Sequence, residues 1–545
     1  MFLLFTIHYS LNSRDDMEHV ACDVLVLGSG AAGLRAAISA REAGLDVLVL
    51  SRAEPGKSTC TGFSAGVMGG ADSSGAGGHL ERTLQAGRGI NQSVLAEILC
   101  EEAPARLDEL MRWGIQAEVR HGFLFAKGRP PVMGEQIVRC LIGKNRELGT
   151  RFMGNLWASG LVMENGVAGL TGFARQSGEL VEFSSGAVVL ATGGAAALFL
   201  RHDNPGQMLG DGWTLAIEAG ALLQDMEFVQ FYPLCLAEPG HAPLVIPPRL
   251  ADHGLLINEG GEDILKKYGI EERPAAERAR DRLSLALFQE IYRNGQRIFL
   301  DLRDITEEKW QGDPFSASMR HILGDRYGAV SRRLRVGPAA HHTMGGVIID
   351  GQGATSVPGL FAAGEVTGGL HGANRMGGNA LSETLVFGAR AGNSAADWAK
   401  GNGPEERRSV LRRLRERSCA LESLRGGETV LLDRIRKIMW EDGGIMRNEE
   451  GLSSALGNMR EILGSFSSSG PGSKKTLTPD QVSAIELSSA ARAASLILEA
   501  AVRRLESRGS HFRQDYPEQN DRQWLGHLQV KAVPNGDVWG FVAKR

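Results

Sequence analysis

Three glycines near the start of the chain have the spacing of a phosphate-binding turn. Gly28, Gly30 and Gly33 follow the apolar run 24–27 and precede a helix-like segment, 34–43. In such a turn the first glycine allows a tight bend, the second lets the backbone approach a pyrophosphate, and the third lets the helix pack closely on the strand. The helix N terminus then points at the phosphates. This context predicts a dinucleotide-binding βαβ unit.

The end of the next strand bears on which dinucleotide binds. The apolar run 46–50 leads into Ser51 and Arg52, where an NAD-binding chain has an acidic residue for the ribose hydroxyls. This difference argues against NAD as the primary ligand.

Two later segments repeat the strand-and-glycine pattern. Residues 187–194 and 359–365 each combine an apolar run with a glycine turn. Residues 151–182 alternate as strands do, with turns at 165–166 and 177–178. We therefore expect the chain to enter the nucleotide-binding sheet more than once.

The length of the chain predicts several domains around a shared cleft. A chain of 545 residues exceeds what one hydrophobic core usually supports, and ligands favour clefts between domains. We predict an α/β fold: a Rossmann-like nucleotide-binding domain, an inserted α+β substrate or capping domain, and a C-terminal helical domain. The predicted limits are 1–19 for a disordered N-terminal extension, with Met17 as an alternative start, 20–230 and 354–403 for the nucleotide-binding domain, 231–353 for the inserted domain, and 404–545 for the helical domain and tail.

Charge and cysteine usage exclude several kinds of partner. The 60 basic and 64 acidic residues give a formal charge of −4, which offers no broad field for nucleic acid or an anionic membrane. We expect neither nucleic-acid binding nor direct membrane insertion, because no stretch is long and apolar enough to span a bilayer. The six cysteines form no CxxC pair and no metal-ligand spacing, so we predict no metal site and a cytoplasmic setting.

Blocks spread across nearly the whole chain resemble the flavoprotein family of succinate dehydrogenase, fumarate reductase and L-aspartate oxidase. Those in the first 381 residues are Gly28–Gly33, Ala191–Gly194, Gly210–Gly212, Asp225–Phe231, His341–Gly346, Gly359–Glu365 and His371–Leu381. Those that look most like the L-aspartate oxidase version are Ile438–Trp440, Gly444–Arg447, Glu506–Phe512 and Asp515–Pro517. Together they are specific for the family and much less so for the substrate.

The resemblance implies FAD as the cofactor. The residues implied to bind it are Gly28, Gly30, Ala32 and Gly33 at the pyrophosphate, Ser51, Arg52, Ala191, Thr192, Gly193 and Asp211 at the adenosine, Ser58, Thr59 and Gly66 along the isoalloxazine ring, Glu365 at the ribityl or ribose hydroxyls, and Asn379, Ala380 and Leu381 near the flavin carbonyl. Backbone N–H groups at the start of a helix stabilise negative charge on a reduced flavin.

The same resemblance predicts that FAD is not covalently attached. Family members with covalent FAD use a histidine in a Ser-His-Thr sequence, and this chain has Ser58, Thr59 and Cys60 there. Threonine cannot form the flavin–imidazole bond. Cys60 could react with flavin, but a small buried residue is the simpler interpretation.

Two residues that the family uses for its dicarboxylate substrate are present. They are His341, which can donate to a carboxylate oxygen, and Arg375, whose planar fork suits a carboxylate. The alternative for each is structural: a hydrogen-bonded histidine before a Gly-Gly turn, and an arginine that holds a loop. Because both lie inside family blocks, we favour substrate contact.

Other positions depart from the family pattern. Tyr232 replaces a carboxylate-binding histidine, and Ile246-Pro247-Pro248 replaces a Thr-Glu pair. In the segment beginning Arg280-Asp281, Leu285 stands where the alignment of the motif places the proton-shuttling arginine. We therefore expect a less polar or larger substrate with one carboxylate or similar anion on Arg375, and Tyr232, then His341, as candidate proton donors.

Together with the resemblance, these features predict an FAD-dependent oxidoreductase that transfers hydride between the flavin and a C–C, C=C or C–N bond of a carboxylate-bearing substrate other than fumarate or succinate. One alternative is an L-aspartate oxidase-like enzyme. Another is the flavoprotein subunit of a larger complex, with an iron–sulfur or quinone-linked electron-transfer partner and peripheral membrane attachment through it. A third is a flavin-binding protein that has lost catalysis and has a structural role.

Overall fold

A seven-stranded sheet forms the centre of the computed structural model, which describes residues 18–70, 76–402, 413, 424–425, 430–468, 476–534 and 536–544. The parallel strands are β1 (Glu18–Leu27), β2 (Val47–Leu50), β6 (Arg151–Met153), β9 (Leu180–Leu190) and β16 (Leu360–Ala362). The antiparallel strands β8 (Val167–Ala174) and β7 (Leu156–Met163) extend it, with the predicted turn between them. Residues 1–17, in the predicted N-terminal extension, lie outside the described residues.

The register of the sheet explains where a ligand binds. Val24 pairs with Val47 of β2 and with Ala187 of β9, and Leu360 of β16 pairs with Val188. The turns that follow β1, β9 and β16 therefore meet at one edge of the sheet. In sheets of this kind ligands bind outside the carboxyl ends of the strands.

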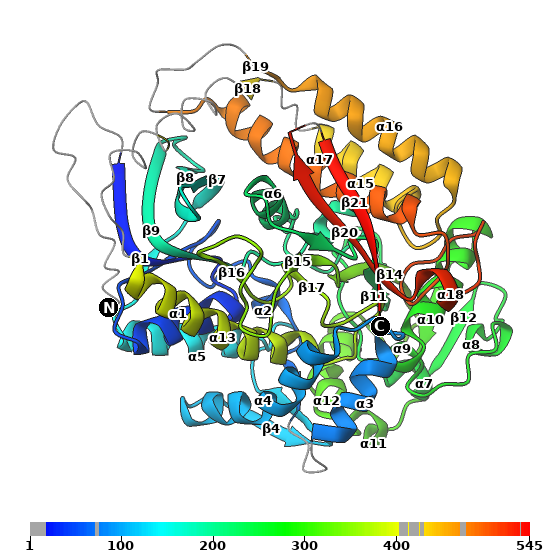
Figure 1. The fold of residues 1–545 in the computed structure, drawn as a ribbon. Coiled ribbons are helices and arrows are strands. Elements are labelled where there is room, and N and C mark those ends of the chain that lie inside the picture. The colour runs from blue at the N-terminus through cyan, green and yellow to red at the C-terminus, as the bar shows by residue number, and fades with distance from the viewer. Residues whose placement is uncertain are drawn as a thin grey trace.

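One face of the sheet is covered by α1 (Ala31–Glu42), α5 (Glu135–Glu147) and the long α13 (Asn379–Gly401), as Figure 1 shows. α1 and α13 approach closely at two glycines of α13. A Cβ on Gly388 would lie 2.7 Å from the Ala32 carbonyl oxygen, and one on Gly392 would lie 2.2 Å from that of Ala36. Two helices that are far apart in the sequence thus form one layer.

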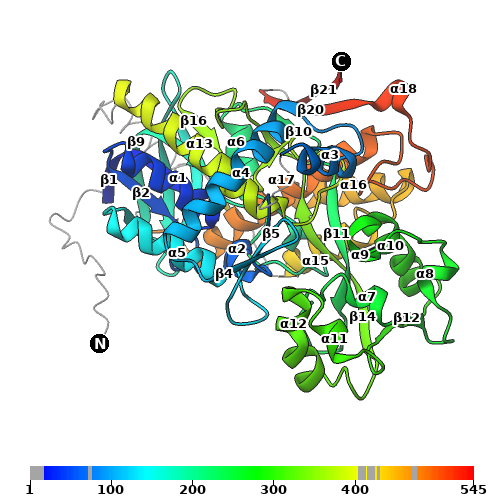
Figure 2. The ribbon, with the colours of Figure 1, turned by 90° about the horizontal axis from the view of Figure 1, so that it is seen from below.

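The predicted inserted domain has a sheet and a hydrophobic core of its own. Its strands run in the order β11 (Val229–Leu236), β14 (Leu334–Thr343), β13 (Ile298–Asp301) and β12 (Leu255–Asn258). Figure 2 shows it as a lobe beside the central sheet. Its helices are α7 (Leu250–His253), α8 (Ile264–Lys267), α9 (Ala275–Arg278), α10 (Arg280–Phe288), α11 (Glu307–Trp310) and α12 (Pro314–His321). The exact domain limits stay a prediction.

A small sheet and two helices lie between the two units. The sheet has the order β3 (Val67–Gly69), β5 (Phe123–Ala126) and β4 (Ala117–Arg120), and the helices are α3 (Ala76–Ala86) and α4 (Ser93–Arg112). Two short helices, α2 (Cys60–Phe63) and α6 (Asp211–Glu218), follow glycine- and polar-rich loops.

The C-terminal part is helical, as predicted, but it ends in strands. α15 (Val430–Glu441), α16 (Glu449–Ser465) and α17 (Pro479–Arg503) are followed by α18 (Asp521–Trp524) and the hairpin β20 (Gly526–Val533) and β21 (Gly536–Ala543). β20 pairs with β10 (Leu223–Gln224), which pairs with β15 (Gly346–Ile348) and through it with β17 (Thr367–Gly368). A separate pair joins β18 (Leu424–Arg425) to β19 (Ser467–Ser468). The end of the chain therefore completes a sheet begun elsewhere.

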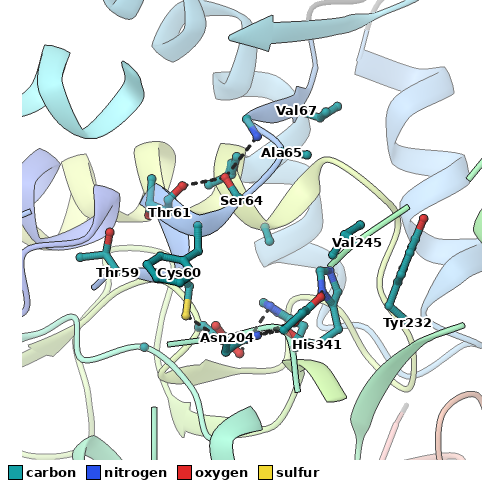
Figure 3. Close-up of a pocket in the computed structure, with 18 of the residues that line it drawn as sticks. Thr59, Cys60, Thr61, Ser64, Ala65, Val67, Asn204, Tyr232, Val245 and His341 are labelled. Carbon is teal, nitrogen blue, oxygen red and sulfur yellow. Dashed lines mark hydrogen bonds and ion pairs between the residues drawn. The ribbon is translucent and has the colours of Figure 1, made fainter. Parts of the chain in front are cut away.

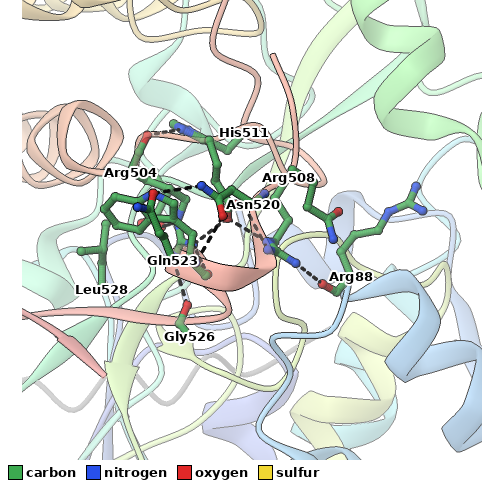
Figure 4. A network of polar contacts seen from close by, with 12 residues as sticks. Arg88, Arg504, Arg508, His511, Asn520, Gln523, Gly526 and Leu528 are labelled. Carbon is green, nitrogen blue, oxygen red and sulfur yellow. Dashed lines mark hydrogen bonds and ion pairs between the residues drawn. The ribbon is translucent and has the colours of Figure 1, made fainter. Parts of the chain in front are cut away.

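A buried polar network fixes this tail (Figure 4). Arg504 is fully buried, binds Glu227 and donates to Glu506 at 3.0 Å. Arg508 also binds Glu506, at 2.8 Å, and donates to the Arg88 carbonyl oxygen at 2.9 Å. Removing one member of such a buried ion-pair network leaves a charge without compensation. The block Glu506–Phe512 is thus an anchor between the tail and the loop that precedes α4.

Within the described residues, every helix is too short or too polar to cross a bilayer.

Candidate active site

One cavity of about 1280 Å³ lies at the sheet edge where the glycine turns meet. It extends between the central sheet, the small sheet and the inserted domain. The predicted residues that line it are Gly28, Gly30, Ala32, Ser51, Arg52, Ser58, Thr59, Gly66, Ala191, Thr192, Gly193, Asp211, Tyr232, His341, Glu365, Arg375, Ala380 and Leu381. The predicted Gly33 and Asn379 do not line it.

The first glycine turn has the form that a pyrophosphate needs. Gly28 has φ +117°, and a Cβ there would lie 2.1 Å from the Ala191 carbonyl oxygen. A Cβ on Gly33 would lie 2.0 Å from the Gly28 carbonyl oxygen, so Gly33 serves helix packing rather than ligand contact. At Gly30 a side chain would meet no protein atom nearer than 3.6 Å, so the space beside it belongs to the cavity. Gly30 has no side chain to cap α1, and the Thr61 hydroxyl accepts from the Ala31 N–H at 3.1 Å, so the helix N terminus is only partly open to the cavity.

The residues after β2 and at the start of α6, which are predicted to bind the adenosine, form one end of the cavity. Arg52 pairs with Asp211 at 3.0 Å, and its guanidinium carbon lies 3.6 Å from the centre of the Trp157 ring. Ser51 donates to the Ala53 carbonyl oxygen. The Thr192 hydroxyl is buried and has no hydrogen-bond partner among the described residues. A ligand with hydroxyl or ring-nitrogen groups would satisfy it.

Glu365 and the start of α13 form the opposite end. The Glu365 carboxylate accepts from the Thr343 backbone N–H at 3.0 Å and from its hydroxyl at 3.2 Å. Burial, with a smaller contribution from Glu383, raises the pKa of Glu365 to about 7. Ala380 and Leu381 line the cavity at the uncapped N terminus of α13.

The prediction for Asn379 concerns its backbone N–H at the start of α13, whereas its side chain contacts α3. Its amide nitrogen donates to the Thr83 hydroxyl at 2.8 Å, and its amide oxygen lies 2.7 Å from His79 Nε2. The side chain therefore ties α13 to α3 behind the cavity wall.

The loop along the predicted ring position carries no histidine. The Thr59 hydroxyl accepts from the Gly62 N–H at 3.0 Å and so caps α2. Cys60 Sγ points to Asn204 Oδ1 at 3.0 Å, and burial raises its thiol pKa well above the ordinary value (Figure 3). A thiol held as a neutral donor is a poor nucleophile. These contacts support dissociable FAD.

Two buried arginines meet on one amide oxygen. Arg375 NH2 lies 2.9 Å, and Arg280 NH1 2.8 Å, from Gln230 Oε1. Arg375 Nε is buried without a partner in the described residues, and Arg280 NH2 also has none there. Burial, then the charge of Arg280, lowers the pKa of Arg375 to about 9. Two adjacent cations with free N–H groups are a binding site for an anion.

This pair corrects the prediction that the pocket has lost an arginine of α10. Leu285 does not line the cavity and packs half-buried against the main core. Arg280, at the first residue of the same helix, lines it. At about 100° per residue, positions 280 and 285 point about 140° apart. The sequence alone could have distinguished the two residues, because helical spacing places positions 280 and 285 on different faces of the helix.

His341 is oriented by an acid that the sequence analysis missed. Its Nδ1 lies 2.7 Å from Asp203 Oδ2, and Asn204 Nδ2 donates to the His341 carbonyl oxygen at 2.9 Å. Burial lowers the pKa of His341, against the opposing charge of Asp203. A neutral ring that donates from Nδ1 presents Nε2 as an acceptor. No local motif signals Asp203, because it comes from a different segment.

Tyr232 lines the cavity beside His341, with ring centres 5.5 Å apart (Figure 3). Its hydroxyl donates to the Ile246 carbonyl oxygen at 2.7 Å, and burial raises its pKa well above the ordinary value. This corrects its ranking as first proton donor, because the proton is engaged by the protein backbone. The ring serves as a wall.

His342, His371 and Glu383 were not predicted as a group. Their ligand atoms lie within 4.8 Å of one another, which a metal ion could bridge. His371 Nε2 already lies 2.9 Å from Glu383, which accounts for two of the three without a metal. His342 lines the cavity, and its Nε2 is buried without a partner among the described residues.

Glycine turns at one sheet edge, two helix N termini at the cavity and a buried anion site under a separate lobe define a dinucleotide-dependent oxidoreductase. Comparison with known proteins agrees. Residues 23–381 match the FAD binding domain family, and residues 432–538 match the fumarate reductase flavoprotein C-terminal family. The chain belongs to the family of FAD-dependent fumarate reductase and succinate dehydrogenase flavoproteins, and FAD is its cofactor.

Individual relatives span nearly the whole chain. One polypeptide of the fumarate reductase (CoM/CoB) of Methanothermobacter marburgensis is 33% identical, with 92% of this chain and 96% of the relative covered. L-aspartate oxidase of Nostoc is 30% identical, with 93% of each covered. A variant of Escherichia coli quinol fumarate reductase has a TM-score of 0.83 at 27% identity, with 97% of each chain covered. The predicted fold class and enzyme class are confirmed.

Proposed function

We propose that this flavoprotein adds or removes hydrogen across a carbon–carbon bond next to a single carboxylate. The observation that supports this most is the pair Arg280 and Arg375, which share Gln230 and keep unpartnered N–H groups at the cavity among the described residues. Bound FAD would supply hydride transfer to and from carbon. The residues of the chain would hold the carboxylate and move the proton.

Arg375 would bind the carboxylate. Its free Nε and the adjacent NH2 form the fork that matches two carboxylate oxygens. His341, with its ring fixed by Asp203, would orient the same group from the side. Together they would hold the substrate against the wall formed by the flavin-binding loops.

Arg280 would move the proton. It enters the cavity from the inserted domain, and its Nε and NH1 are engaged by Ala276 and Gln230 while NH2 is not. Burial lowers its pKa from the ordinary arginine value, which brings proton release closer to neutral pH. Tyr232 and Asp281 favour the charged form and keep it a cation at rest.

The far side of the reacting site offers little to a second carboxylate. Tyr232, Val245 and Pro248 line it, and the Tyr232 hydroxyl is engaged. Burying a carboxylate there without a partner would cost several kcal/mol. We therefore expect a monocarboxylic enoate, or its saturated product, to be preferred over fumarate and succinate at this end.

The test is reduction of crotonate and fumarate by the holoenzyme with a reduced dye, and the reverse reaction on butyrate and succinate. We expect a higher kcat/KM for the monocarboxylate, and loss of turnover in Arg375→Gln but not in Arg460→Gln, an exposed arginine of α16. Fumarate turnover that exceeds crotonate turnover would refute the substrate assignment. No flavin bleaching with any acid would favour a protein without catalysis.

A second candidate is L-aspartate oxidation, which the 30% identity to the Nostoc enzyme supports. Oxygen-dependent release of hydrogen peroxide from aspartate would identify it.

Because solved relatives are described as quinol fumarate reductases, we also propose that electrons pass to or from a separate quinone-linked or iron–sulfur protein. That partner would place this chain at a membrane surface; a cytoplasmic location stays a prediction.

A further inference from the structure

The cavity continues well past the buried arginines. Its volume of about 1280 Å³ includes the space for FAD at the glycine turns, and its lining also includes residues of the small sheet and of the inserted domain. Beyond Tyr232 and Arg280 it opens between the inserted domain and the small sheet. We call this part the outer cavity. The residues that line it are Arg120, His121, Phe123, Phe125, Pro131, Val132, His241, Pro243, Leu244, Arg249, Arg278, Pro314, Phe315, Ile322, Arg326 and Tyr327.

The middle of the outer cavity is apolar. Phe123 and Phe125 of β5 line one wall, and Phe315 and Leu244 line the wall from the inserted domain. Tyr327 packs edge-on against His241, with ring centres 5.3 Å apart. A flat or aliphatic body fits between walls of this kind better than a charged one.

The rim of the outer cavity is basic. Arg249, Arg278 and Arg326 are exposed there, and none makes an ion pair with a described carboxylate. Arg249 and Arg278 lie on neighbouring helices, because α7 binds α9 through Asp252, which accepts from the Ala275 N–H at 3.2 Å. Many neighbouring charged groups of the inserted domain are paired, such as Arg273 with Asp252 and Arg282 with Glu272.

Acidic residues at the same rim are mostly engaged elsewhere. Glu272 pairs with Arg282 at 2.7 Å, and Asp313 accepts from two N–H groups at the start of α12 at 3.0 Å. Glu277 also lines the cavity, nearer to Arg280. The rim thus keeps an excess of unpaired positive charge, among the described residues, around an apolar passage.

We propose that the outer cavity binds a second oxyanion, a carboxylate or a phosphate, carried at the far end of an elongated apolar substrate. This rests on the proposed function, which puts the reacting carboxylate at Arg280 and Arg375. Arg249, Arg278 and Arg326 hold the distal group, because guanidinium groups bind both anions with paired hydrogen bonds. The aromatic walls hold the body between the two anions.

The experiment compares ligands that differ only at the far end. Trans-2-enoic acids and trans-2-enedioic acids of equal chain length, and the ω-phosphate esters of the same enoates, are titrated into the holoenzyme, and the dissociation constant is read from the flavin absorbance. Ionic strength is held at about 0.15 M, so that long-range attraction is screened. Beyond a threshold chain length we expect the distal anion to tighten binding at least tenfold. A larger gain in affinity from the distal carboxylate would identify a carboxylate site, and a larger gain from the distal phosphate would identify a phosphate site.

The variant Arg249→Gln/Arg278→Gln/Arg326→Gln should abolish that gain and leave the affinity for the monoacids unchanged. Arg460→Gln, outside the cavity, should change neither. Equal affinity for monoacids and both distal anions at every length would overturn the proposal. So would a triple variant that weakens monoacids and diacids alike, because that pattern marks general attraction of anions.

A binding measurement without enoates separates this proposal from the proposed function. Inorganic pyrophosphate is titrated by calorimetry into the wild-type holoenzyme and the triple variant. Binding that the triple variant loses, with no flavin response to any enoate, would support the rim site and refute the reaction assigned to Arg280 and Arg375. No pyrophosphate binding, together with no effect of a distal anion, refutes the rim site alone.

Discussion

The Arg88 guanidinium lies 2.9 Å from the Asp281 carboxylate and joins the loop between α3 and α4 to the first turn of α10. Asp281 follows Arg280 directly, and the Arg88 carbonyl accepts from Arg508 of the C-terminal anchor. One ion pair therefore connects the tail, the cavity wall and the inserted domain. We expect it to position Arg280.

Breaking the Arg88–Asp281 pair should lower kcat strongly and the free energy of unfolding only slightly. Asp281→Asn is expected to reduce kcat by roughly tenfold to a hundredfold, because small displacements of a reacting group cost that much. Steady-state kinetics on the best substrate measures it. The exchanged double variant Arg88→Asp/Asp281→Arg should recover part of the loss. An unchanged kcat in Asp281→Asn would show that Arg280 needs no such support.

Arg280 should matter for the reaction and Leu285 should not. Arg280→Gln is expected to lower kcat by about 10²- to 10⁴-fold, the range for loss of a positioned proton donor. Leu285→Ala, on the other face of α10, should keep kcat within about twofold while lowering the melting temperature. If Leu285→Ala abolished turnover and Arg280→Gln did not, the assignment of the helix faces would be wrong.

Gly28→Ala should abolish FAD uptake. The new Cβ would lie 2.1 Å from the Ala191 carbonyl oxygen at a φ of +117°, so the turn cannot keep its form. The purified variant should be colourless, while wild-type protein is yellow.

Acid denaturation of wild-type protein should release all of its flavin, because Thr59 cannot form a bond to it. Flavin that remains with the precipitate would point to Cys60.

Glu365 should make the stability of the apoprotein depend on pH. Its pKa is raised to about 7, so the folded apoprotein holds a proton that the unfolded chain has lost. The contribution of Glu365 to stability should therefore fall as pH rises from about 4.5 to about 7 and be flat above, by at most about 3 kcal/mol; it is the difference between wild-type protein and Glu365→Gln, because buried histidines such as His341 give the opposite slope. Denaturant unfolding of both proteins across this range measures it. The same slope in both proteins would assign the effect to another group.

The C-terminal anchor should be a large stabilising element. Arg504→Met leaves Glu227 and Glu506 buried without their shared cation, and such losses typically cost about 3–5 kcal/mol. Thermal unfolding of the holoenzyme measures the loss. Arg503→Met, at the neighbouring half-exposed position, should cost about 1 kcal/mol or less. Equal effects of both substitutions would show that the network contributes no more than a surface pair.

Much of the fold and of the cofactor site followed from local sequence. Glycine turns and apolar runs report on backbone geometry within a few residues, and this is why the turns at 28–33, 191–194 and 363–365 were predictable. Partners that come from distant segments were not. Asp203 meets His341, and Gln230 meets Arg280, only after the inserted domain packs on the sheet.

Two errors have definite physical causes. The motif of α10 assigns the proton-shuttle position to Leu285, but the helical faces put Arg280 at the cavity and Leu285 away from it. The terminal hairpin was overlooked because β20 alternates weakly and finds its partner, β10, about 300 residues away. The helical spacing of α10 carries a short-range signal for the first contact, whereas β20 carries none for its pairing with β10.

The pairing of β20 with β10, and the bond from Arg508 to the Arg88 carbonyl, set an order for biogenesis. During synthesis the segments that cradle the cofactor leave the ribosome more than a hundred residues before the strand and the arginine that brace them. A nascent chain can thus form its central sheet early, but the contacts of the tail with Arg88 and β10 form only when translation is nearly complete. Fusions and deletions at the C terminus would act on cofactor retention through these contacts, although the strand and the arginine come from a segment far in sequence from the glycine turns.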